Sequence, residues 1–199
     1  MRGGGNKKYF IRELRISLMA TLLLVILLCG IYPSLVWMLG QGLFPEESNG
    51  SLWVRDGTVV ASNLLAQGFT DPKYFHPRPS AAGQGYDATA SGGSNLGPTS
   101  KKLVDGVRRR VTDYRLENGL PANTIVPADA VTTSASGLDP HISVKNARLQ
   151  ANRVAKARSL RVERVWEKID KHTEGRTLGI LGEPRVNVLA LNLDLDGKQ

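Results

Sequence analysis

The stretch ISLMATLLLVILLCGIYPSLVWMLG occupies residues 16–40 and contains no charged side chain. The uncharged run continues to Pro45 and so covers the 30 residues between Arg15 and Glu46. About 20 apolar residues in a helix are enough to cross the hydrocarbon core of a bilayer. Only a helix satisfies its backbone polar groups within a single span. The sequence therefore predicts one transmembrane helix, at residues 16–42.

Two details of this run refine the prediction. Pro33 has no backbone N–H, so we expect a kink in the helix near it. The run is longer than the roughly 7 to 15 apolar residues of a cleaved signal peptide, and it lacks an Ala-x-Ala-like cleavage site. We therefore expect the segment to remain as an anchor, with Gly30, Ser34 and Gly40 offering small surfaces on which another helix could pack.

The charges beside the predicted span indicate its orientation. Basic residues before the span are Arg2, Lys7, Lys8, Arg12 and Arg15, and only Arg55 follows within about fifteen residues of its end. Cytoplasmic flanks of membrane helices carry the excess of Lys and Arg. The prediction is a basic cytoplasmic N-terminus at residues 1–15 and a soluble extracytoplasmic domain at residues 43–199.

Composition excludes several classes of function. The 199 residues carry a formal net charge of +8, but half of this lies in residues 1–15, where it is explained by topology, so no nucleic-acid partner is expected. A hydrophobic content of 41% is enough for a folded core. The single cysteine, Cys29, lies in the predicted span, which leaves residues 43–199 without an internal disulfide or a multi-cysteine zinc site.

The predicted outer domain begins with a hairpin and a long loop. Two short β-like runs at residues 52–54 and 58–61 flank Asp56-Gly57, a common hairpin turn. Residues 68–98 are crowded with Gly, Pro, Ser and Asn, which is too irregular for a long helix or strand. Loops of this length are usually functional or disordered. Its aromatic residues, Phe69, Tyr74, Phe75 and Tyr86, argue for an ordered loop.

Three helices and a final strand are predicted in the remainder. The first helix begins at Thr99 or Ser100 and ends at Glu117, and the second is capped by Ser143. The third begins near Ser159. The expected buried stripes are Leu103, Val107, Val111 and Tyr114, then Val144, Ala147, Ala151 and Val154, then Val162, Val165, Trp166 and Ile169. Alternating leucines at residues 186–195 predict a strand. Because no βαβ repeat is present, the predicted fold class is α+β, a mixed helix and sheet domain behind one membrane helix.

Catalytic and metal-binding patterns are absent from the sequence. The histidines are His76, His141 and His172, and none has HxxxH or HExxH spacing, so no metal site and no catalytic residue is predicted. A hydrogen bond that fixes the loop before a helix is the favoured role of His141 after Asp139-Pro140. A membrane-tethered extracytoplasmic enzyme that uses His141, Asp139 and a nearby serine stays open as an alternative.

A glycine-rich segment is the candidate ligand site. Ser91, Gly92, Gly93, Ser94 and Asn95, called the SGGSN segment below, could present backbone N–H groups and hydroxyls to an anion ahead of a helix. There is no GxxxxGK[ST] loop, and a glycine-rich structural turn is the favoured interpretation of the residues alone. An anion-binding module therefore stays open beside the turn. Nine basic and three acidic residues between 145 and 171 fit either a solvated helix face or a surface for an acidic partner.

Several longer motifs occur in order behind the single span. They are Tyr32-Pro33, Phe44-Pro45, Asn49-Gly50-Ser51, Tyr74-Phe75, RPSA at residues 78–81, SGGSNLGP at 91–98, SGLDPHIS at 136–143 and GEPRVNV at 182–188. From about residue 30 to 195 the chain resembles the C subunit of the Kdp-type potassium-transporting P-type ATPase of bacteria.

The resemblance implies a non-catalytic accessory subunit of an ATP-driven high-affinity potassium uptake complex. Its implied partners are a potassium-conducting subunit and an ATP-hydrolysing subunit in the bacterial inner membrane, and it has no cofactor of its own. The family subunit is described as stabilising the complex and as a catalytic chaperone that raises the ATP affinity of the ATPase subunit. In that proposal the SGGSN segment contacts nucleotide. The predicted topology conflicts with such a contact, since it places Ser91 outside the membrane and ATP is cytoplasmic.

Overall fold

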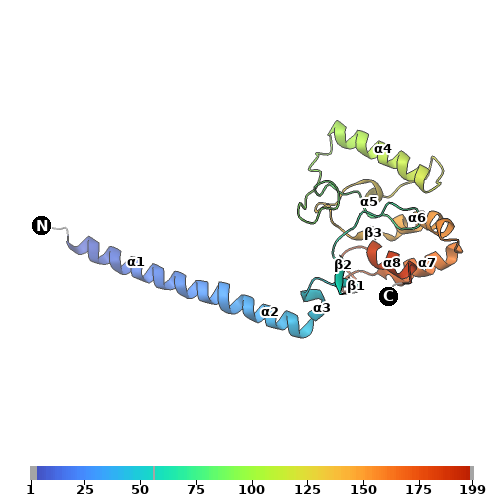
Figure 1. Cartoon of the computed structure of the whole chain (residues 1–199). Helices are drawn as coiled ribbons and strands as arrows, with labels where there is room; N and C mark the ends of the chain where they lie inside the picture. Colours follow the sequence, from blue (N-terminus) through green and yellow to red (C-terminus); the bar gives the residue numbers. More distant parts are fainter. Residues whose placement is uncertain (1–3, 56, 198–199) are drawn as a thin grey trace. The chain divides into compact units, whose positions relative to one another are not determined.

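The computed structural model describes the backbone of residues 4–55 and 57–197, which fall into two compact units, Met1–Leu52 and Trp53–Gln199. Arg2 and Asp56, which entered the predictions above, lie outside the described residues. Figure 1 labels the helices and strands used below. We call the second unit the C-terminal unit.

The first unit is one long helix followed by a short one. It consists of α1 (Gly4–Val25), the π-helical segment η1 (Ile26–Ile31) and α2 (Tyr32–Leu43), which run into one another, and then α3 (Pro45–Ser48) (Figure 1). Within the described residues, Lys8–Leu43 is the one helix long and apolar enough to cross a membrane, with a mean hydropathy of 2.5. The prediction of one N-terminal helix capable of crossing a membrane is therefore confirmed, and this helix begins further toward the N-terminus than residue 16.

Pro33 is accommodated by a π-helical segment. The backbone N–H of Tyr32 donates to the carbonyl of Leu27, five residues earlier, so the helix is locally wider. A proline ring in a regular helix would clash with the carbonyl four residues before it, here that of Cys29. Widening the preceding turn relieves this clash, and the Ser34 hydroxyl donates to the Gly30 carbonyl over 2.8 Å. The sequence located this irregularity correctly, and the structure shows its form.

The C-terminal unit contains two small sheets. Strands β1 (Leu52–Arg55) and β2 (Thr58–Ser62) form a two-stranded sheet, which confirms the predicted hairpin. A second sheet has the antiparallel order β3 (His141–Ser143), β5 (Arg185–Asn187), β4 (Thr173–Glu174). In its register, Ile142 is opposite Val186, and Thr173 is opposite Val186 on the other side. This mixture confirms the α+β class.

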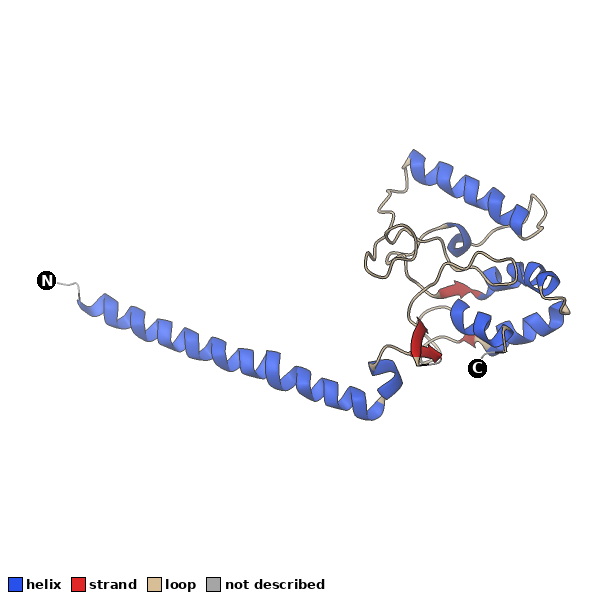
Figure 2. Ribbon diagram, viewed as in Figure 1, coloured by secondary structure: helices blue, strands red, loops and turns tan. Residues whose placement is uncertain are grey.

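The described part of the C-terminal unit has five helices. They are α4 (Lys101–Glu117), α5 (Ala128–Val131), α6 (Val144–Ala157), α7 (Val162–Lys171) and α8 (Val188–Leu195). In Figure 2, α4 lies apart from the sheets and the other helices lie closer to them. Ser143 caps α6 as predicted, because its side chain accepts from the backbone N–H of Asn146. Ser159 does not open α7: it adopts a φ of 54°, and Arg161 occupies the N-cap. Trp166 is 40% exposed, so the buried stripe of α7 is narrower than predicted.

The predicted strand at residues 186–195 is wrong beyond Asn187. The chain turns there into α8, because the Asn187 side chain accepts from the backbone N–H of Ala190 and caps the helix. Val188, Leu191 and Leu195 recur with helical spacing and pack in the core. The residues that would have faced solvent in a strand, Asn192 and Asp194, are buried in the helix with polar partners. The alternation of leucines was compatible with both structures.

The long loop is anchored to the core at Phe75, while much of the rest of it is exposed. Residues 68–98 contain no helix or strand, as predicted, yet Phe75 within them is fully buried. The Asn192 amide bonds both the N–H and the carbonyl of Phe75, at 2.8 and 2.9 Å. The Gln150 amide likewise accepts from the backbone N–H of His76 and donates to its carbonyl, at 2.8 and 3.1 Å. These two amide side chains replace the strand partner that the loop lacks, and they anchor it against α6 and α8.

Candidate functional site

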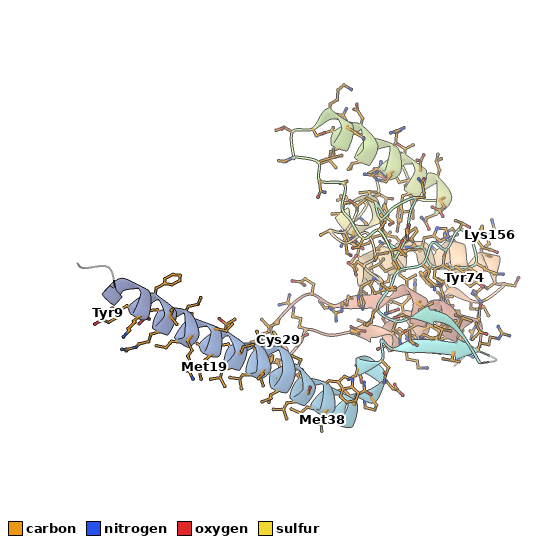
Figure 3. The ribbon with its side chains drawn as sticks, turned by 60° about the vertical axis from the view of Figure 1, so that its left-hand side comes forward. Tyr9, Met19, Cys29, Met38, Tyr74 and Lys156 are labelled. Atoms are coloured by element: carbon orange, nitrogen blue, oxygen red, sulfur yellow. The ribbon has the colours of Figure 1, made fainter. Side chains whose placement is uncertain are left out.

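Almost all described side chains of the long helix are exposed within the first unit. Its large apolar residues, including Met19 and Met38, are at least 47% exposed, and they project from the ribbon on all sides (Figure 3). A shallow groove at the π segment is lined by Cys29, Gly30 and Ser34 between larger aliphatic side chains. Small residues let membrane helices approach closely. This groove is therefore the candidate packing face of the span.

Two of the three small residues that the sequence singled out belong to this groove. A Cβ at Gly30 would meet no atom within 4 Å, so the space there is open. Gly40 differs, since a Cβ there would approach the Ser48 hydroxyl to 2.9 Å. The small size of Gly40 thus serves the turn from α2 into α3.

The SGGSN segment lies against the loop at residues 133–137. The Gly92 N–H donates to the Ser136 carbonyl over 2.9 Å, and the Ser91 hydroxyl donates to the same oxygen over 3.0 Å. The Thr133 hydroxyl donates to that of Ser94 over 3.3 Å. Several of the groups that could bind an anion are therefore already used within the fold.

The glycines in these two loops allow their backbones to approach closely. A Cβ on Gly93 would come within 2.9 Å of the Ala135 carbonyl oxygen. Gly137 has a φ of 69°, and a Cβ there would lie 2.7 Å from both the Ala82 nitrogen and the Gly92 oxygen. These contacts support the interpretation as a structural turn. Nucleotide contact by the SGGSN segment stays a prediction.

His141 lies between two carboxylates. Its Nδ1 is 3.4 Å from Asp139, and its Nε2 is 3.7 Å from Glu174. Asp139 also accepts from the His141 backbone N–H and pairs with Arg78 at 3.1 Å. Burial alone would raise the pKa of Asp139, but the hydrogen bonds from His141 and Arg78 outweigh it and lower that pKa. This arrangement fixes the loop before α6, and it does not favour a serine–histidine pair.

The other two histidines also connect separate elements. His76 Nδ1 lies 2.7 Å from Glu117 at the end of α4, and this hydrogen bond lowers the pKa of Glu117. His172 Nε2 lies 2.9 Å from Asp194. His76 and His172 each join the helix or loop that carries them to a distant part of the sequence.

Asp194 is the most strongly perturbed carboxylate of the C-terminal unit. Its side chain is 4% exposed, and Lys168, His172 and Lys171 surround it at 2.8, 2.9 and 3.5 Å. Burial would raise its pKa, but the hydrogen bonds from Lys168 and His172 and the charge of Lys171 lower the pKa to about 2. The cluster ties α8 to α7.

Several basic residues between 145 and 171 point into the fold. Arg153 donates to the carbonyls of Pro72 and Tyr74 at 2.7 and 2.9 Å, and burial lowers its pKa. Arg158 donates to the Lys73 carbonyl and to Asp196, each at 2.7 Å. These guanidinium groups hold the long loop onto α6. Sequence reasoning missed this role, because the number of basic residues does not show which of their side chains point into the fold.

Two cavities of the C-terminal unit are lined in part by Phe69 of the long loop. The first, about 470 Å³, is also lined by the β1–β2 hairpin, by Tyr74, and by Leu189, Leu193 and neighbouring residues of α8. Its aromatic rings of Phe69 and Tyr74 lie 5.2 Å apart (Tyr74 is labelled in Figure 3). The second, about 230 Å³, lies beneath α4 and is lined by polar groups such as Tyr114, whose pKa is raised by burial. In the described residues no group of three His, Cys, Asp or Glu side chains could hold a metal ion.

Comparison with known proteins gives a consistent result. The family described as "KdpC: K+-transporting ATPase, c chain" matches residues 14–197. Each of three similar proteins is named "Potassium-transporting ATPase KdpC subunit". The protein of Mycobacterium tuberculosis H37Rv is 55% identical over 93% of this chain and 98% of its own length. That of Myxococcus xanthus is 56% identical over 91% and 86%, and that of Rhodospirillum rubrum is 56% identical over 94% and 96%.

Proposed function

Because the chain belongs to the family of the K+-transporting ATPase c chain, we propose that it is a membrane-anchored accessory subunit that assembles and stabilises this ATPase complex. The observation that carries the proposal is the helix Lys8–Leu43, which is long and apolar enough to cross a membrane. A single span cannot enclose an ion path by itself. In a complex, a helix of another subunit would pack into the groove at Gly30 and Ser34.

The proposed orientation places the N-terminus in the cytoplasm and the C-terminal unit outside the inner membrane. Its support is the positive charge before the span, at Lys8, Arg12 and Arg15, against the single Arg55 soon after it. Within the complex, the partners would be the potassium-conducting subunit and the ATP-hydrolysing subunit. Both are implied by the family.

An effect on ATP affinity would then be indirect. In this orientation the SGGSN segment is separated by the membrane from cytoplasmic ATP. Its backbone is also held by the loop at residues 133–137. We therefore propose that any rise in the ATP affinity of the ATPase subunit is transmitted through the span and its packing partners.

Affinity purification from native membranes in mild detergent tests the proposal. The chain should bring down a P-type ATPase and a channel-like subunit, and the purified material should hydrolyse ATP in response to potassium. Recovery of the chain alone, with no such activity, would refute the accessory role and favour the alternative, a membrane-tethered enzyme.

A variant pair tests the packing face. Gly30→Leu fills the groove and should reduce recovery of the partners, while the chain itself tolerates it because the space around Gly30 is open. Leu18→Phe is the control, since Leu18 is 59% exposed and does not line the groove. Equal recovery with both variants would show that another face of the span makes the contact.

A further inference from the structure

The connection between β4 and β5 carries an exposed apolar tip. Leu178, Ile180 and Leu181 are 85%, 74% and 58% exposed. No large apolar side chain in the described part of the chain is more exposed than Leu178. Single exposed apolar residues are ordinary on protein surfaces, whereas a group of three at one tip marks a contact site. We call residues 176–183 the apolar loop.

The apolar loop has a defined shape. Thr177 and Leu181 face each other in an isolated bridge, with backbone hydrogen bonds of 2.8 and 3.0 Å. Leu178 adopts a φ of 54°, a left-handed conformation that is unfavourable for a residue with a side chain. Glycine would relieve this strain, and Leu178 gains no burial in exchange. The loop therefore holds Leu178 outward at a fixed position, which lowers the entropy cost of docking.

The charges beside the tip are paired with one another. Arg176 binds both oxygens of Glu183, at 2.8 and 2.9 Å. Arg185 binds Glu174 at 2.8 Å. Loops that insert into anionic lipid combine apolar residues with unpaired Lys and Arg. A neutral rim around an apolar tip instead complements an uncharged apolar depression on a protein, where a few such side chains carry most of the binding energy.

We infer that the apolar loop docks onto the extracytoplasmic surface of another subunit of the complex, with Leu178, Ile180 and Leu181 inserted into an apolar depression. This inference rests on the proposed function, which places the loop outside the membrane and supplies the partner. The anchor ends at Leu43 and the C-terminal unit begins at Trp53, so the tether keeps the loop close to subunits bound by the span. Such tethering raises the effective concentration, and a small contact is sufficient.

Fluorescence at the tip tests the contact in the intact complex. Leu178→Cys is labelled with bimane in a Cys29→Ser background, which removes the only native cysteine and must first recover the partners as the wild type does, because Cys29 lines the groove at Gly30. Ile125→Cys is the matched control, because Ile125 is an aliphatic residue of the same unit that is 74% exposed. In the complex, the label at 178 should shift to the blue and be quenched by iodide at least threefold less than in the chain alone, while the label at 125 stays unchanged.

Two results would overturn the inference. Equal iodide quenching at 178 and 125 in the complex would show that the tip is free. Quenching of the 178 label by nitroxide lipids, with the chain alone in nanodiscs, would assign the tip to the bilayer.

A double variant tests the energetic role. Leu178→Ser with Ile180→Ser should leave the thermal midpoint of the chain unchanged, because both side chains are exposed, and should speed dissociation of the detergent-solubilised complex at least tenfold. The control is Leu116→Ser with Ile125→Ser, which alters two similarly exposed residues elsewhere. If the wild-type chain recovers no partners, the proposed function fails. If it recovers them and the double variant dissociates at the wild-type rate, only the docking inference fails.

Discussion

Replacing Asp194 by Asn should destabilise the C-terminal unit, and the loss should depend on pH. The buried carboxylate accepts from Lys168 and His172 and lies 3.5 Å from Lys171. Asparagine keeps the volume but removes the negative charge. The ammonium groups of Lys168 and Lys171 then lie close together without a counter-charge, His172 loses its carboxylate partner, and the attachment of α8 to α7 weakens.

The size of the effect follows from the pKa. The folded state lowers the pKa of Asp194 from 3.8 to about 2. At about 1.4 kcal/mol per pKa unit, this corresponds to about 2 kcal/mol of folding free energy, and partial exposure of the lysines reduces it toward about 1 kcal/mol. Because the folded pKa lies below the unfolded one, this stabilisation is fully present above about pH 4. It is lost as the pH falls toward 2.

Urea unfolding of the full chain in detergent, followed by tryptophan fluorescence, measures this difference. Asp194→Asn should be less stable than wild type by about 1–2 kcal/mol at pH 7, and the two curves should converge near pH 2. Asp170→Asn is the control, because Asp170 pairs with Arg148 at the surface and should change stability by less than about 0.5 kcal/mol. Equal stability of wild type and Asp194→Asn at pH 7, or a difference that does not change with pH, would refute the reasoning.

Three further predictions concern the loops and the topology. Gly137→Ala should lower the free energy of unfolding in urea by about 3 kcal/mol, because its Cβ would clash with two backbone atoms at a positive φ. Gly119→Ala, at a φ of 62° in open space, should lower it by about 1 kcal/mol. Equal losses for the two variants would contradict this account. Asn192→Ala should cost about 2–4 kcal/mol, because both backbone groups of Phe75 lose their partners, and an unchanged unfolding midpoint would oppose this role. Ala122 is exposed, so Ala122→Cys should react with a membrane-impermeant maleimide on intact cells, and protection until lysis would reverse the proposed orientation.

The span was the most predictable part of the chain. The hydrophobicity of 30 consecutive uncharged residues adds up, and it outweighs the local conformational preference of any single residue such as Pro33. Pro33 correctly marked the irregular position, because a missing backbone donor has a direct structural consequence. A π-helical segment, as opposed to a simple kink, depends on how the preceding turn rearranges. The sequence does not specify that choice.

The misassigned C-terminal strand shows where pattern reasoning fails. Val188, Leu191 and Leu195 form a helical stripe, while Leu189, Leu191 and Leu193 form an alternating one, so the apolar pattern fits both. Burial of Asn192 and Asp194 decides the outcome, and it depends on Phe75, Lys168 and His172, which are distant in sequence. Such a decision is made by tertiary contacts.

The structural interpretation of the SGGSN segment was predictable from the sequence, whereas its role as a ligand site stays a prediction. Its glycines indicated a turn, and the structure shows the packing partner of that turn at residues 133–137. The counted positive charges of α6 and α7 gave no sign that Arg153 and Arg158 bind backbone carbonyls. The exposed tip at Leu178 was also missed, because an apolar residue between short polar and glycine-containing stretches gives no sequence signal for exposure.

The most direct test of the account is to assemble the transporter with and without this chain. The other subunits are expressed in the same membrane, and the yield of the solubilised complex and its potassium-stimulated ATP hydrolysis are measured. The account predicts that both are lost without the chain and restored by the full-length protein. A complex that forms in normal yield, with full potassium-stimulated activity and an unchanged ATP affinity in its absence, would contradict the accessory role.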